Sequence, residues 1–190
     1  SNTVHPVDLE VATCDVNKRT VQVVTGTQIS ADVKEKYTIY TYEITIPQPF
    51  VDDSGNTVDT TFIGVRFRNP SATYEGYFFN ASLYKKSDAG KTEMLENNAF
   101  GNGYLDKWTW GYKDFRSDAN LGLSEFTQDS NPNVTLKVMD FDESKIPTYE
   151  PPYVPSQNKK MLYFKGTKRG PLYQRVEKLT TGGTYTLTFE

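Results

Sequence analysis

Six residues between positions 104 and 114 place aromatic rings and carboxylates at every second position: Tyr104, Asp106, Trp108, Trp110, Tyr112 and Asp114. Both tryptophans of the chain are among them. Successive side chains of a β-strand point to opposite faces, so a strand over this segment would gather all six on one surface. Aromatic rings stack on the C–H faces of sugars, and carboxylates accept hydrogen bonds from hydroxyl groups. The spacing therefore predicts a ligand-binding platform for a ring-shaped molecule such as a carbohydrate.

The same segment is also suited to the protein core. The opposite face of the strand would carry Lys107, Thr109 and Lys113, so the aromatic face is the one that could be buried. Against burial stands the free-energy cost of removing the carboxylates of Asp106 and Asp114 from water without partners. Two alternatives follow, an exposed binding platform and an aromatic wall of the core.

Catalytic motifs built on histidine or cysteine have little support in this sequence. The single histidine, His5, lies close to the first residue, and the single cysteine, Cys14, has no second cysteine with which to form an intrachain disulfide. A Ser-His-Asp triad, a Cys-His pair or a zinc site needs a better-placed histidine or more of these residues. We therefore expect no catalytic residues and no enzyme activity.

Carboxylate pairs are the remaining source of catalytic chemistry. Glycoside hydrolysis uses two carboxylates about 5 to 9 Å apart, one on each side of the scissile bond. Asp106 with Asp114, or Asp140 with Asp142, would form such a pair. Acidic residues are ordinarily found on the surface without such a role, so a small glycoside-active enzyme stands as the weakest of three functional hypotheses.

A short acidic group follows one of the expected strands. Asp140, Asp142 and Glu143 together offer the carboxylate oxygens that a calcium ion prefers. Their spacing lacks the full EF-hand pattern, and aspartate is common in solvated turns. We expect no cofactor, and calcium bound at these three residues is the alternative.

The charge balance limits the partners of the protein. The chain has 21 basic and 24 acidic residues and a formal net charge of −3, which gives no broad positive field to attract nucleic acid. No apolar run of about 18 residues is present to span a membrane. We expect a carbohydrate or protein ligand, no nucleic acid and no transmembrane segment. Composition favours an extracellular or cell-surface location.

The elements that would position these groups are strands. Apolar and polar residues alternate in most of the apolar segments, which lie at 7–11, 20–24, 36–46, 61–67, 77–83, 134–139, 161–164 and 185–189. Several buried faces are predicted. They include Tyr40, Tyr42, Ile44 and Ile46, then Thr61, Ile63, Val65 and Phe67, and then Tyr77, Phe79, Ala81 and Leu83. About nine or ten short strands, separated by turns, indicate an all-β protein.

The expected architecture is an antiparallel β-sandwich of the jelly-roll or immunoglobulin-like type, with long decorated loops. We expect a single domain over residues 1–190, with a proline-rich surface segment at 144–158. The leading functional hypothesis is a non-catalytic, exported or cell-surface module that binds carbohydrate through the aromatic platform. The alternative is a structural or assembly subunit, such as an adhesin, pilus-like or capsid-like protein. In that case edge strands and the proline-rich segment make protein contacts, and the chain self-associates.

Overall fold

A computed structural model gives the structure of the chain. It describes residues 7–14, 20–33, 38–46, 50–51, 54–58, 60–67, 74–110, 121–128, 134–140, 160–166, 171–176 and 179–190. The regular elements within these ranges are all β-strands, and each strand pair is antiparallel. No helix that is long and apolar enough to cross a membrane occurs among these residues. The predicted all-β, antiparallel class is confirmed.

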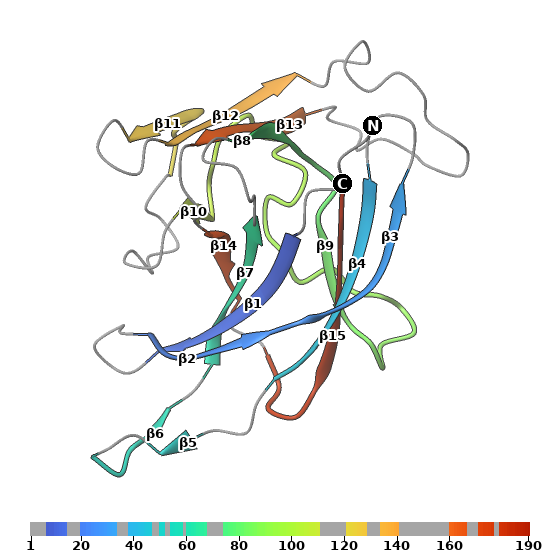
Figure 1. Cartoon of the computed structure of the whole chain (residues 1–190), viewed down its shortest axis with the longest axis vertical. Helices are drawn as coiled ribbons and strands as arrows, with labels where there is room; N and C mark the ends of the chain where they lie inside the picture. The colour runs from blue at the N-terminus through green and yellow to red at the C-terminus, as the bar shows by residue number, and fades with distance from the viewer. Residues whose placement is uncertain are drawn as a thin grey trace.

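Three sheets and one hairpin contain the described strands (Figure 1). The first sheet has the order β10 (Trp108–Trp110), β14 (Pro171–Arg175), β7 (Thr60–Phe67), β1 (Val7–Cys14), β2 (Thr20–Thr25). The second has the order β11 (Glu125–Gln128), β12 (Val134–Asp140), β13 (Lys160–Gly166), β8 (Tyr74–Phe78). The third has the order β3 (Thr27–Val33), β4 (Thr38–Thr45), β15 (Thr184–Phe189), β9 (Ser82–Lys85). The hairpin pairs β5 (Phe50–Val51) with β6 (Thr57–Val58).

Two short connections carry the chain from a strand of one sheet directly into a strand of another. Only Gly26 separates β2 in the first sheet from β3 in the third, so one extended run supplies a strand to each. The chain also passes from β8 in the second sheet to β9 in the third. At this corner the N–H of Phe79 donates to the carbonyl of Glu190 at 2.8 Å, and the N–H of Glu190 donates back at 2.9 Å. Strands that switch sheets at bends are typical of closed or orthogonally packed β-structures.

The predicted number of nine or ten strands is too low, because the described residues alone contain fifteen strands. Several of these, such as β3, β11 and β14, lie outside the expected apolar segments, and one expected segment divides between two sheets. The predicted strand at 77–83 is in fact the end of β8 and the start of β9, with Asn80 at a positive φ of 53° between them. Asparagine tolerates this left-handed conformation better than most residues.

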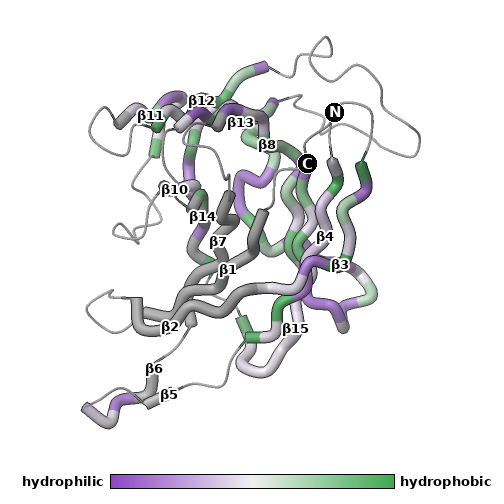
Figure 2. Tube along the Cα trace, in the orientation of Figure 1, coloured by the Kyte–Doolittle hydropathy of each residue, from purple (hydrophilic) through white to green (hydrophobic). Residues whose placement is uncertain are grey.

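One large cluster of buried apolar side chains joins all three sheets. It includes Tyr42 and Leu187 from the third sheet, Leu136 from the second, and Leu172 and Trp108 from the first. The predicted buried face of the strand at 38–45 is confirmed, because Tyr40, Tyr42, Ile44 and Ile46 are all buried. Figure 2 colours β12 by hydropathy, and its buried residues alternate with more exposed ones: Val134, Leu136 and Val138 are buried in the core.

The predicted buried face of residues 77–83 needs a correction. Phe78, rather than Tyr77, joins the main core, and Tyr77 is half-buried on the outer side of the second sheet. Phe79, Ala81 and Leu83 are buried as expected. The error arises because three aromatic residues in a row, Tyr77 to Phe79, conceal which side of the strand faces inward.

Candidate functional site

The predicted platform at 104–114 is not a continuous strand. The strand β10 begins only at Trp108, and Lys107 before it has a positive φ of 72°. This left-handed residue turns the chain and interrupts the alternation of side chains. Tyr104 and Asp106 therefore do not share a strand face with Trp108, and the expectation of six residues on one face is wrong for this half of the segment.

Trp108 belongs to the core and is only 2% exposed. Its ring lies 5.6 Å from those of Phe78 and Phe100, measured between ring centroids. The indole Nε1–H donates to the backbone carbonyl of Asn97 at 2.9 Å, which satisfies its one polar atom. Trp108 is therefore part of an aromatic wall of the core. The prediction that it binds ligand is wrong, because its ring is closed off from solvent.

Asp106 holds two loop segments together. Its Oδ1 accepts from the backbone N–H of Gly122 at 2.6 Å, and its Oδ2 accepts from the amide of Asn102 at 2.8 Å. A further hydrogen bond of 2.7 Å joins the Leu105 N–H to the Leu123 carbonyl. The carboxylate of Asp106 thus has hydrogen-bond partners and remains half-exposed. It does not carry the free-energy cost of an unpaired carboxylate removed from water.

Tyr104 is the described member of the platform that remains open to solvent, with 44% of its surface exposed. Two large apolar side chains on the segment joined to it, Leu121 and Leu123, are also exposed. Trp110 ends β10. Its side chain, together with Tyr112 and Asp114, lies outside the described residues.

A second group of aromatic and charged side chains gathers on the outer face of the second sheet. Five residues from three neighbouring strands form this surface, here called the tyrosine face: Glu75, Tyr77, Lys137, Tyr163 and Lys165. Strand register brings them together, because Tyr163 pairs with Tyr77 on one side and with Lys137 on the other, and Lys165 pairs with Glu75. Directly opposed residues of antiparallel strands share a face of the sheet.

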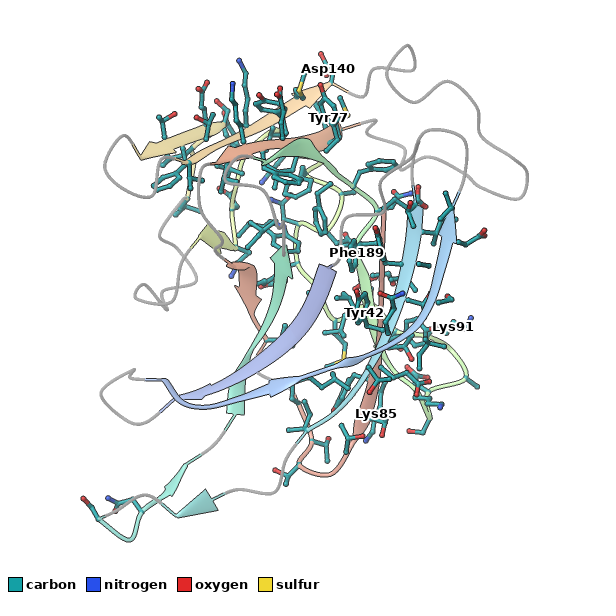
Figure 3. All side chains as sticks on the ribbon, in the orientation of Figure 1. Tyr42, Tyr77, Lys85, Lys91, Asp140 and Phe189 are labelled. Atoms are coloured by element: carbon teal, nitrogen blue, oxygen red, sulfur yellow. The ribbon has the colours of Figure 1, made fainter. Side chains whose placement is uncertain are left out.

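The buried residues of the same strands show which way the tyrosine face points. Phe78, Leu162, Phe164 and Leu136 alternate with its members and are buried in the main core. The residues between them must therefore point outward. Figure 3 shows Tyr77 on this outer side of the second sheet, away from the core residues Tyr42 and Phe189. Glu75, Lys137 and Lys165 are exposed, and both tyrosines are half-buried.

A hydrogen bond holds one of the two rings in place. The hydroxyl of Tyr163 donates to Oε1 of Glu75 at 2.7 Å. This bond, followed by desolvation and the nearby negative charge, raises the pKa of Tyr163 to about 12. The phenol of Tyr163 is thus neutral over the physiological range. Tyr163 is ordered without being removed from solvent.

Apolar packing holds the other ring in place. Tyr77 and Met139 pack against Phe79 and Met161, which form a small buried cluster separate from the main core. The centroids of the Tyr77 and Tyr163 rings lie 5.7 Å apart with 51° between their planes. Lys137 forms an ion pair with Glu125 of β11, with 3.7 Å between Nζ and Oε2. The tyrosine face therefore combines two positioned rings with exposed groups of both charges.

Sequence analysis missed the tyrosine face for an identifiable reason. The alternation of residues 77–83 predicts Tyr77 on the buried side, and Tyr163 lies in a short apolar run with no alternation to orient it. A signal was nevertheless present, because Glu75 precedes Tyr77 by two residues and Lys165 follows Tyr163 by two. In an antiparallel pair this spacing places unlike charges opposite each other and the tyrosines side by side.

The predicted calcium site is only partly described. Asp140 ends β12, and its Oδ1 lies 2.6 Å from Nζ of Lys160 on the neighbouring strand. Asp142 and Glu143 lie outside the described residues, so calcium binding stays a prediction. Within the ranges that the structure covers, no three His, Cys, Asp or Glu side chains come together to hold a metal ion.

Comparisons with models of known families, with curated proteins and with solved structures find no match to this chain.

Proposed function

We propose that the protein is a non-catalytic, exported or cell-surface module, built as a β-sandwich, that binds carbohydrate through the tyrosine face. The observation that carries this proposal is the pair of ordered tyrosine rings 5.7 Å apart on the outer surface of an antiparallel sheet. The aromatic platform of the leading hypothesis thus moves from residues 104–114 to β8, β12 and β13. The sandwich architecture is supported by one apolar core that draws on all three sheets.

Carbohydrate suits the chemistry of this surface. The faces of aromatic rings contact the C–H groups of a sugar, and nearby charged and polar groups exchange hydrogen bonds with its hydroxyls. Glu75 supplies acceptor oxygens beside Tyr163, and Lys165 supplies donors on the adjoining row of the sheet. Because one ring is held by a hydrogen bond and the other by packing, little side-chain freedom is lost on binding.

The carboxylates that a glycoside-active enzyme would use have other partners in the structure, which supports a non-catalytic function. Asp106 already binds Gly122 and Asn102, and Asp140 is paired with Lys160. Asp106 thus links two loop segments, and Asp140 forms an ion pair at the surface. Their proposed catalytic partners, Asp114 and Asp142, lie outside the described residues.

Calorimetric titration against a panel of soluble oligosaccharides tests the proposal. Tyr163→Ala removes a stacking ring and should weaken binding of the recognised glycan about tenfold. Tyr163→Phe keeps the ring and should retain most of the affinity. Tyr104→Ala is the matched control, because it removes an exposed tyrosine from a different surface.

Two outcomes would overturn the proposal. Binding lost in Tyr104→Ala but kept in Tyr163→Ala would move the site to the loop at 102–106. A panel that gives no heat of binding to the wild-type protein would exclude carbohydrate for this surface.

An assembly subunit is the second candidate, and one observation favours it. The terminal strand of the third sheet, β3, exposes two large apolar side chains, Ile29 and Val33. The proline-rich segment at 144–158, the other predicted contact region, lies outside the described residues.

A further inference from the structure

β3 is the terminal strand of the third sheet in the part of the chain that the structure covers. It pairs with β4 on one side, and Figure 1 shows it along the outer side of the sheet. Six of its seven residues are exposed, and only Ala31 is partly buried. An edge strand of this length presents backbone N–H and C=O groups to any other strand that can approach.

The side chains of β3 do little to prevent such an approach. Natural edge strands are usually protected by lysine, proline or inward-pointing charges. Between Thr27 and Val33 there is no Lys, Arg or Pro, and Asp32 is the one charged residue. The protective feature that is present is an irregularity in register between Gln28 and Ser30, opposite β4.

Two exposed large apolar side chains lie on this strand. Ile29 is 53% exposed and Val33 is 46% exposed. They lie four residues apart, on either side of Ala31. A partner strand that met both of them would need apolar residues at the same spacing.

A second copy of β3 meets this requirement. When two copies run antiparallel and are centred on Ala31, Ile29 of each lies opposite Val33 of the other. In the same register Asp32 lies opposite Ser30, so the two carboxylates do not face each other. The strand is therefore complementary to itself both in apolar contacts and in charge.

From this complementarity we infer that the protein pairs with a second copy of itself through β3. The pairing is antiparallel, centred on Ala31, and it joins the two third sheets across a two-fold axis into one continuous sheet. This interaction goes beyond carbohydrate binding, because it uses a different sheet from the tyrosine face. It gives one assembly two copies of that face.

Sedimentation equilibrium over a range of concentrations tests for the pair. The wild-type protein should show a reversible dimer. Ile29→Lys places a charge opposite Val33 and should weaken dimerisation about tenfold or more. The double variant Ile29→Lys with Val33→Glu sets opposite charges against each other in both contacts, so the dimer should return.

Disulfide trapping tests the register separately. In a Cys14→Ser background, Ile29→Cys and Val33→Cys chains should cross-link when they are mixed and oxidised. Residues 29 and 33 of opposite copies would be directly opposed, about 4.5 to 5.5 Å apart, which is close enough for a disulfide. Each chain alone should remain largely uncrosslinked, because two cysteines at the same position would be too distant from each other. Circular dichroism confirms that each variant is folded.

The inference is overturned by a protein that sediments as a monomer at every concentration. It is also overturned by a dimer that Ile29→Lys leaves unchanged, or by cross-links that form in the single-cysteine chains as readily as in the mixture. Glycan affinity per chain should be the same in the monomeric variant, so failure of the dimer leaves the proposed function standing.

Discussion

The two aromatic residues that matter most in this protein have opposite environments. Trp108 is enclosed by Phe78 and Phe100, whereas Tyr163 is held by a hydrogen bond to Glu75 at an open surface. The first stabilises the fold, and the second is available to a ligand. Their roles are separated by burial and by hydrogen-bonding partner, and each can be tested by substitution.

Substitution of Trp108 should affect stability. Trp108→Ala leaves a cavity among large side chains and should lower the free energy of unfolding by about 3 to 5 kcal/mol. Tyr104→Ala, at an exposed position, should change it by less than about 0.5 kcal/mol. Urea denaturation measures both. A Trp108→Ala protein as stable as the control would show that the indole is not part of the core.

The ionisation of Tyr163 should reveal its bond to Glu75. The folded pKa of about 12 lies above the ordinary value near 10. The stabilisation from this tyrosine is therefore fully present below about pH 10. It is lost as the pH rises through the folded pKa. Glu75→Gln should bring the pKa of Tyr163 down towards the ordinary value.

Carbon-13 NMR of labelled tyrosines, with Tyr163→Phe to assign the signal, measures that change. Identical titration of Tyr163 in the wild type and in Glu75→Gln would contradict the hydrogen bond. Tyr40 is the internal comparison, because burial raises its pKa and Glu75 is not among the causes.

The long connection between β9 and β10 is held by hydrogen bonds to two side chains, Glu93 within the connection and Gln174 of β14. Oε1 of Glu93 accepts hydrogen bonds from the backbone N–H groups of Leu83, Met94 and Leu95, at 2.9, 3.1 and 3.0 Å. Gln174 of β14 forms a reciprocal pair with the backbone of Glu96, with both distances at 2.8 Å. These bonds fix the loop that leads to Trp108.

Glu93 should therefore contribute to stability despite its exposure. Glu93→Ala removes the carboxylate acceptor of the Leu83 and Leu95 N–H groups, while the N–H of Met94 still donates to the Leu83 carbonyl at 2.9 Å. The substitution should lower the free energy of unfolding by about 1 to 3 kcal/mol. Glu93→Gln keeps an acceptor oxygen and should cost less. Urea denaturation with hydrogen exchange at Leu83 and Leu95 measures the effect. Equal stability of the wild type and Glu93→Ala would contradict this role.

Sequence periodicity predicted elements best where polar and apolar residues alternate clearly. The strand with Tyr42 and Ile44 was predicted with its buried face. The segment before Trp108 was not, because one left-handed residue, Lys107, changes the direction of the chain without a glycine to mark it. The tyrosine face depends on which strands are neighbours, and periodicity carries no information about neighbours.

At the scale of the whole molecule, the two proposed surfaces lie on different sheets around one core. The tyrosine face is on the second sheet, and the pairing edge is on the third. Ligand binding and pairing are therefore separable by mutation. Composition and turn spacing predicted the all-β class. They could not predict that Gly26 and Asn80 lie where the chain passes between sheets, since the same residues also occur in ordinary turns.

A backbone NMR titration of the wild-type protein with the oligosaccharide panel tests carbohydrate binding at the tyrosine face most directly. A recognised glycan should shift the amide signals of 75–77, 135–137 and 163–165 on the second sheet. No comparable shift is expected at 102–106. Shifts confined to the loop around Tyr104, or an unchanged spectrum with every glycan, would contradict carbohydrate binding at the tyrosine face.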